Sequence, residues 1–232
     1  MKYLFPLFLV TVLFLASCGN STEQAVSTSW LDTLKELSPD DIPAAVDSQK
    51  IGFKNGVVVY ESTTLGIKQE ITFWFDDFGN KTRTEIKSEM MGQKMHQLSF
   101  VLDTIIYNID MVAKEGTWNK MELDSTEELN YRNISEADKQ KYNIEELPEE
   151  KILGKECNVF KMQQVSDGQT IDMKVWIWDG IPMKTESTVS GIEVSMEAKS
   201  VKVNLVLPVG IFEIPAEVKI SEEALPVDSI AS

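Results

Sequence analysis

The sequence predicts a mainly β (α+β) domain built on a curved antiparallel sheet, and two observations support this. Apolar and polar residues alternate over many short segments, which is typical of strands with one buried face. The segments follow one another through short connections containing Gly, Asp and Asn, so neighbouring strands are expected to run antiparallel. Apolar residues make up 43% of the 232 residues, enough for a packed core.

The elements can be placed in order along the chain. Apolar residues at helical spacing between Trp30 and Leu37 predict a short helix that Ser29 caps and Pro39 stops. From Gly56 the period changes to two, and roughly nine to eleven strands are expected. The clearest segments are 57–60, 67–76, 81–87, 95–102, 105–109, 116–121, 155–164, 171–177 and 194–205.

Three irregularities are expected within this sheet. Asp179-Gly180 is typical of a type I′ hairpin turn. Pro182 cannot donate a ladder hydrogen bond, so it is expected at an edge or a bulge. The apolar parity changes near Ser200, which predicts a bulge or bend of the kind that a strongly curved sheet requires.

Residues 122–150 break the alternation. They hold ten acidic side chains against Arg132, Lys139 and Lys141. The capping-box pattern from Ser135 to Asp138 predicts a short helix, so this stretch is expected to be an acidic loop and helix crossing between two halves of the sheet. The acids lack the spacing of a calcium loop, which favours a solvated surface over a cation site.

The N-terminus is expected to be an export signal. Residues 1–17 have a basic start, an apolar middle and small residues at the end, and Leu15-Ala16-Ser17-Cys18 resembles a bacterial lipobox. In such signals the Cys carries lipid chains, so Cys18 is the expected lipidation site; the alternative is an ordinary secretory signal with an incidental Cys. Residues 18–28 are expected to be a tether, 29–220 one domain and 221–232 a loose tail.

Localisation follows from this interpretation. The protein is expected to be exported and anchored to the outer membrane by lipid, facing the periplasm, because residue 19 is Gly and not the Asp that resembles an inner-membrane retention signal. Cys157 then has no partner within the chain and is expected to be a small core residue on a strand. A reactive thiol, or a pair between chains, is the alternative.

Composition excludes several functions. A net charge of −15 with only two Arg argues against nucleic acid as a partner. With a single His and no motif of nucleophilic or phosphate chemistry, we expect no catalytic residues, no enzyme activity, no cofactor and no metal. One alternative is kept open, a Cu(I) site of Met90, Met91, Met95 and His96, since thioether and imidazole ligands suit that ion.

Three stretches carry a family resemblance: Trp176 to Lys184, the segment from Leu207-Pro208 to Pro215, and Asp77 to Glu85 with Gly79 and Arg83. Together with the lipobox and the interrupted meander, they resemble bacterial lipoproteins related to the lipoprotein-localisation carriers, over about residues 50 to 218. The resemblance implies a half-open β-barrel closed by short helices, with an apolar hollow for acyl chains. The carriers use a cavity arginine on their cargo, and no residue of this chain is matched to it.

This interpretation predicts a non-catalytic envelope lipoprotein that binds a lipid or acyl chain in the concave face, for carriage or sensing. An apolar lining binds acyl chains without needing precise geometry. The residues expected to line it share the apolar parity of their strands: Ile71, Phe73, Phe75, Leu98, Phe100, Leu102, Met173, Val175, Ile177 and Met196. The alternative is a structural or protein-interaction module with the same fold, a filled core and no ligand.

Overall fold

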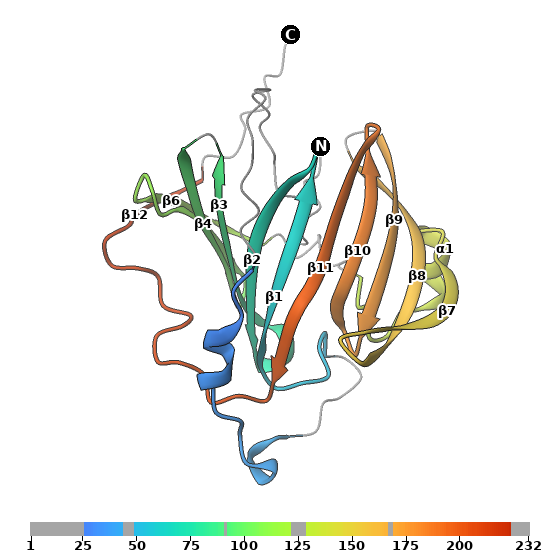
Figure 1. The fold of residues 1–232 in the computed structure, drawn as a ribbon, viewed down its shortest axis with the longest axis horizontal. Coiled ribbons are helices and arrows are strands. Elements are labelled where there is room, and N and C mark those ends of the chain that lie inside the picture. Colours follow the sequence, from blue (N-terminus) through green and yellow to red (C-terminus); the bar gives the residue numbers. More distant parts are fainter. Residues whose placement is uncertain (1–25, 44–48, 91, 122–128, 167–168, 224–232) are drawn as a thin grey trace.

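In the computed structural model the chain forms one open sheet of twelve strands, and residues 26–43, 49–90, 92–121, 129–166 and 169–223 are described. The strand order is β12-β6-β5-β4-β3-β2-β1-β11-β10-β9-β8-β7. All neighbours pair antiparallel except β12 and β6, which are parallel. The sheet curves without closing into a barrel (Figure 1), so the expected fold class is confirmed.

The strands are β1 (Gly56–Thr64), β2 (Ile67–Asp76), β3 (Lys81–Met90), β4 (Gln93–Leu102), β5 (Ile105–Asp110), β6 (Glu115–Lys120), β7 (Glu145–Ile152), β8 (Lys155–Ser166), β9 (Gln169–Trp178), β10 (Ile181–Val189), β11 (Ile192–Val203) and β12 (Lys219–Glu222). The helical pieces are η1 (Ser29–Thr33), η2 (Pro39–Asp41), η3 (Asp77–Gly79) and α1 (Glu136–Lys141).

The irregularities expected from the sequence are present. The register of β1 against β11 shifts where Val59 pairs with Ser200, and that of β10 against β9 shifts after Pro182. Asp179 and Gly180 both have positive φ, at 47° and 88°, as a type I′ turn requires. The capping box of α1 is complete: Ser135 accepts from the Asp138 amide, and the Asp138 carboxylate accepts from the Ser135 amide.

Three expectations for local structure were wrong. The helix at Trp30–Leu37 is the shorter 3₁₀ helix η1, preceded by Thr28 as its N-cap, and Glu36 bridges to Leu205 as a β-bridge. The acidic crossover ends at α1, because β7 already pairs with β8 from Glu145 onward. The expected loose tail from 221 was wrong for its first two residues, because Ser221 and Glu222 belong to β12 and pair with β6.

Some expectations fall outside the described residues. These are the signal peptide at 1–17, Cys18, most of the tether, Met91, residues 122–128 of the acidic stretch and the tail after 223. In the parts of the chain that are described, no helix has both the length and the apolar character needed to cross a membrane.

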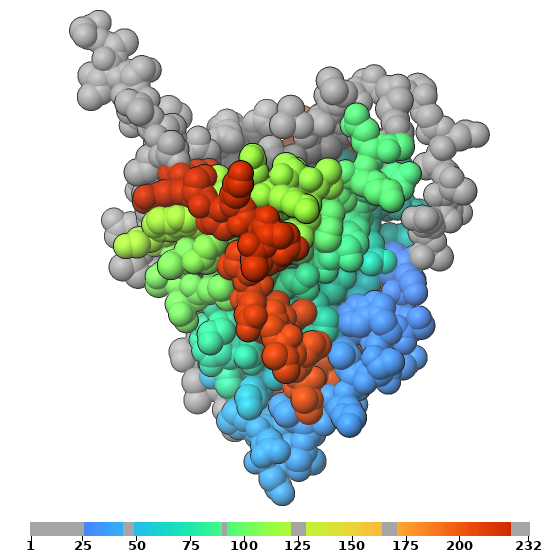
Figure 2. All heavy atoms as spheres, turned by 90° about the vertical axis from the view of Figure 1, so that its left-hand side faces the viewer, coloured from blue at the N-terminus to red at the C-terminus, as the bar shows by residue number. Residues whose placement is uncertain are grey.

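Two segments cover one face of the sheet. Helix η1 lies against β1 and β2 (Figure 1), where Leu31 is buried beside Val57 and Val59, and Trp30 packs on Trp74 with ring centroids 5.7 Å apart. After β11 the chain continues as a segment we call the strap, residues 205–218. The strap crosses β4 and β5 on the same face of the sheet as η1 (Figure 2). The strap is fixed at its start, because the buried Asn55 side chain accepts from the Leu205 amide at 2.7 Å.

Candidate functional site

The two faces of the sheet are identified by strand register, because directly paired residues point to the same side. Phe73 of β2 pairs with Val58 of β1, which pairs with Val201 of β11. The side chains on this side form what we call the Phe73 face, and those on the opposite side form the Trp74 face. Trp74 follows Phe73 in the strand and therefore points the other way.

The Phe73 face continues across β10 to β9. Ser62, on the same side of β1 as Val58, pairs with Met196 of β11. Met196 pairs with Thr185 of β10, which in turn pairs with Val175 of β9. The apolar residues of β2, β11 and β9 therefore lie on one continuous surface.

Register divides the ten residues expected to line a cavity. Seven lie on the Phe73 face: Ile71, Phe73, Phe75, Met173, Val175, Ile177 and Met196. The other three, Leu98, Phe100 and Leu102, lie on the Trp74 face, because Phe73 pairs with Thr84 and Thr84 pairs with Ser99, which is the residue before Phe100. The ten do not line one surface, and whether any of them binds lipid stays a prediction.

Charge is sorted between the two faces. In seven strands that are neighbours in the sheet, β4-β3-β2-β1-β11-β10-β9, every Asp, Glu, Lys, Arg and His within the regular register points to the Trp74 face. Lys199 lies in the β11 bulge and has no paired partner in β1, but its ammonium group is 4.0 Å from Glu61 of the Trp74 face. At the paired positions, the Phe73 face of these strands carries only uncharged residues, in a chain with 25% charged residues. If charged side chains were placed at random, they would occur on both faces. Their restriction to the Trp74 face therefore indicates that the Phe73 face is selected to carry none.

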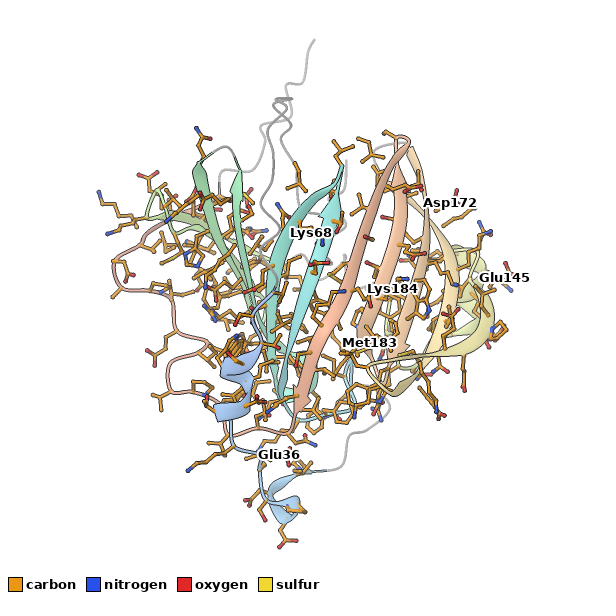
Figure 3. All side chains as sticks on the ribbon, viewed as in Figure 1. Glu36, Lys68, Glu145, Asp172, Met183 and Lys184 are labelled. Carbon is orange, nitrogen blue, oxygen red and sulfur yellow. The ribbon has the colours of Figure 1, made fainter. Side chains whose placement is uncertain are left out.

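The charges of the Trp74 face pair with one another. Lys68 lies 3.8 Å from Glu61, and Lys184 lies 2.6 Å from Glu186; Lys68 and Lys184 are labelled in Figure 3. Trp176, 2% exposed, lies between Lys174 and Lys184, whose ammonium groups are 4.3 and 4.6 Å from its ring centroid. Around β1, β2, β9 and β10 the Trp74 face is thus a surface of ion pairs, and the side chains of Lys174 and Lys184 cover Trp176.

Apolar and polar residues are separated along the Phe73 face. Its centre is apolar: Val58, Ile71, Phe75 and Met196 belong to one buried cluster. From β3 to β6, one register row is polar and uncharged, and it is formed by Thr84, Ser99, Asn108 and Thr117. Ser99 donates to Asn108 at 3.1 Å in an exposed position. Along this row the face changes from apolar to hydroxyl- and amide-bearing, and its first charged residues, Asp110 and Glu115, lie in the next row of β5 and β6.

A second segment packs on the β8–β9 part of the Phe73 face. Val175 and Ile177 are buried with Phe160 and Met162, and residues from 129–144 pack against them, namely Leu129, Tyr131, Ile134 and Ile144. Arg132 fixes this segment, because its Nε lies 2.7 Å from Asp179 Oδ1 at the β9–β10 turn. The acidic crossover is thus folded back onto the sheet.

A cleft of about 500 Å³ lies between the Trp74 face and the strap. Its floor is Arg83, Leu98 and Phe100, and strap residues 209–211 and 213–216 form its other wall. Three residues that the sequence assigned to a family motif or to a lining thus meet here, on the side opposite Phe73. No pattern in the sequence indicated that the strap would fold over them, because that contact joins segments more than a hundred residues apart.

Arg83 belongs to an ionic cluster beside this cleft. Glu85 accepts from Arg83 Nη2 at 3.0 Å, Lys87 Nζ at 2.7 Å and His96 Nε2 at 2.7 Å. Burial alone would raise the pKa of Glu85, but the hydrogen bond from Lys87 and the charges of Arg83 and Lys87 outweigh it and hold that pKa below its ordinary value. One carboxylate is therefore shared by three cationic or basic groups.

Of the four proposed copper ligands, the side chains of Met95 and His96 are described, and they are not brought together. Met95 and His96 are consecutive in β4, so their side chains point to opposite faces. The His96 ring is hydrogen-bonded to the Glu85 carboxylate. Within the described residues no group of three His, Cys, Asp or Glu side chains is placed to hold a metal ion. Cys157 is a buried free thiol on β8, as expected, and burial raises its pKa, which makes it a poor nucleophile.

Comparison with known proteins gives a likeness in structure only. No family model matches the chain, and no curated protein matches it. A conserved uncharacterized protein from Thermus thermophilus superimposes with a TM-score of 0.50 at 6% identity, covering 73% of this chain and 91% of its own. The likeness is one of fold.

Two further structures resemble the chain less closely. A chain of the Pseudomonas aeruginosa MucA/MucB complex gives a TM-score of 0.46 at 10% identity, covering 72% of this chain and 58% of its own. An outer membrane lipoprotein-sorting protein domain from Vibrio parahaemolyticus gives 0.35 at 11% identity, covering 70% and 90%.

Proposed function

We propose that this chain is a non-catalytic binding protein of the cell envelope that holds an acyl chain of a lipid or lipoprotein on its Phe73 face. The observation that carries the proposal is the absence of charge from that face across seven neighbouring strands. A charged side chain facing a hydrocarbon ligand would lose its hydration without gaining a partner, at a cost of several kcal/mol. A surface that binds acyl chains must therefore be free of such groups.

The polar row supports the same ligand class. An acyl chain in a lipid ends at an ester or amide, which accepts hydrogen bonds but carries no charge. Thr84, Ser99 and Asn108 offer hydroxyl and amide donors beside the apolar centre and in register with Phe73. We place the hydrocarbon over Phe73, which is only half-buried, and the linkage over the polar row.

Anchoring is part of the proposal. Cys18 would carry lipid, hold the protein at the outer membrane and leave residues 29–220 in the periplasm. A palmitate analogue that labels the wild-type chain but not Cys18→Ala would establish the modification, and equal labelling of both would exclude it. Binding experiments then use the full chain with Cys18→Ala, so that no attached lipid competes for the site.

A pair of matched variants tests the binding face. Phe73 and Leu102 are both half-buried apolar strand residues, but they point to opposite faces. We expect Phe73→Ser to weaken binding of a neutral fluorescent monoacylglycerol roughly ten-fold, the equivalent of one large apolar side chain leaving the contact. Leu102→Ser should change it less than about two-fold.

The control and the contrary outcomes are clear. Circular dichroism must show both variants folded. Equal loss in the two variants would mean that binding does not use the Phe73 face. If the Cys18→Ala chain binds no monoacylglycerol and native mass spectrometry finds no lipid on it, the acyl-binding proposal fails and the interaction-module alternative takes its place.

A further inference from the structure

We propose that the cleft beneath the strap is a second ligand site, separate from the Phe73 face, which takes a small aliphatic carboxylate with its anionic end on Arg83. The cleft is about 500 Å³, within the ~300–1,000 Å³ range of small-molecule sites. It is lined by apolar side chains on both walls and by one arginine on its floor. The proposal does not depend on acyl binding at the Phe73 face.

Arg83 has donors left for a ligand. Its side chain is only 15% exposed, and its ion pair with Glu85 uses Nη2 alone, at 3.0 Å. Glu85 Oε1 is shared by Lys87 and His96, so one carboxylate faces two permanent cations and an imidazole. The guanidinium also lies 6.0 Å from the ring centroid of Phe100, which keeps it over the apolar floor. Arg83, Lys87 and Glu85 together therefore carry a net positive charge, in a chain whose net charge is −15.

The other charged group of the cleft is on the opposite wall. Glu213 belongs to the strap, where its carboxylate folds back toward Gly210, 3.3 Å from the position a Cβ would take there. Arg83 and Glu213 form no ion pair, although both are described residues that line the same cleft. The guanidinium is thus not neutralised from above, and an incoming carboxylate can reach it.

The strap is built to admit a ligand. The backbone amides of Ile211, Glu213 and Val218 bond within the strap, to Pro208, Gly210 and Pro215. In the described part of the chain, no hydrogen bond from residues 208–218 reaches the sheet. Between its ends this segment is held by apolar contacts such as those of Ile214 with the Leu98 cluster, so it can lift without breaking a ladder.

An aliphatic carboxylate satisfies both halves of the cleft. Its chain would lie against Leu98, Phe100 and Ile214, and its carboxylate would form a charge-assisted pair with Arg83. A neutral alcohol of equal length would gain the apolar contacts alone. An organic cation would meet Arg83 as a like charge.

Isothermal titration calorimetry of the full Cys18→Ala chain with octanoate and with octanol tests this. We expect octanoate to bind more tightly than octanol, and Arg83→Gln to weaken octanoate roughly ten-fold while changing octanol less than about two-fold. Lys87→Gln is the matched control, because it removes the same charge from the same Glu85 cluster without lining the cleft. It should change octanoate affinity less than about three-fold.

Two further variants keep the test decisive. Ala216→Trp fills the cleft from the strap, so it should abolish octanoate binding even if Arg83→Gln fails to fold. Phe73→Ser should leave octanoate affinity unchanged. No octanoate binding by the parent chain, equal effects of Arg83→Gln and Lys87→Gln, or full binding by Ala216→Trp would each overturn the second site. Loss through Phe73→Ser alone would overturn it while leaving the acyl-binding proposal standing.

Discussion

Replacing Phe75 by Ala should lower the free energy of unfolding by about 3–5 kcal/mol. Phe75 is 0% exposed on the Phe73 face of β2. Its ring lies 5.9 Å from that of Phe73, and its Cζ would lie 2.7 Å from a Cβ placed on Gly56 of the neighbouring strand. The ring occupies the space that a side chain at position 56 would need. Its removal therefore leaves a cavity that Gly56, which has no side chain, cannot fill.

Urea unfolding of the Cys18→Ala chain measures this effect. Leu65→Ala is the control, since Leu65 is 56% exposed at the β1–β2 turn and should change stability by less than about 0.5 kcal/mol. A loss of about 1 kcal/mol or less in Phe75→Ala would contradict the packing of this face as described.

Replacing Gly180 by Ala should cost more than about 2 kcal/mol, because two penalties combine. Gly180 has a φ of +88° in the β9–β10 turn, a conformation that a Cβ disfavours. A Cβ there would also overlap the carbonyl oxygen of Lys50 and lie 3.0 Å from the Cα of Ile51. The 50–52 segment is held against this turn, because the Gly52 amide donates to the Asp179 carbonyl at 2.9 Å.

Gly191→Ala separates the two penalties. Gly191 has a φ of +81° in the β10–β11 turn, but a Cβ there meets nothing within 4 Å. It should therefore cost only the conformational part, about 1 kcal/mol. Equal destabilisation of Gly180→Ala and Gly191→Ala would show that the 50–52 segment does not press on the β9–β10 turn.

The inner strands could be predicted from the sequence, and the two edge strands could not. The inner strands alternate clearly, as Ile71-Thr72-Phe73-Trp74-Phe75 does in β2. The edge strand β7 reads Glu-Glu-Leu-Pro-Glu-Glu-Lys-Ile and β12 reads Lys-Ile-Ser-Glu. Charges and Pro protect sheet edges from further pairing, and they also remove the alternation by which a strand is predicted.

For the candidate site, the sequence predicted only which residues of the same strand point to the same side. Alternation shows that Phe73 and Phe75 share a side, and that Leu98 and Phe100 share a side, but it does not relate the two pairs. That relation depends on register, which the turns set: Thr84 pairs with Phe73, and Ser99 pairs with Thr84. Ser99 therefore points to the same face as Phe73, and Phe100, the next residue in the strand, points to the opposite face.

The cleft at Arg83 could not be predicted because its second wall is the strap. Its apolar residues, such as Ile211 and Ile214, resemble a weak final strand in sequence. Pro208 and Pro215 have no backbone N–H to donate to a neighbouring strand. The segment therefore forms local turns and crosses the Trp74 face instead of pairing as a strand.

Photolabelling tests the central claim most directly. The full Cys18→Ala chain is irradiated with a palmitoyl monoacylglycerol that carries a diazirine near the end of its chain, and the adducts are located by peptide mass spectrometry. We predict saturable adducts on half-buried residues of the Phe73 face, such as Phe73 of β2 and Met173 of β9. Adducts confined to residues of the Trp74 face, or labelling that excess unlabelled lipid does not reduce, would contradict the account.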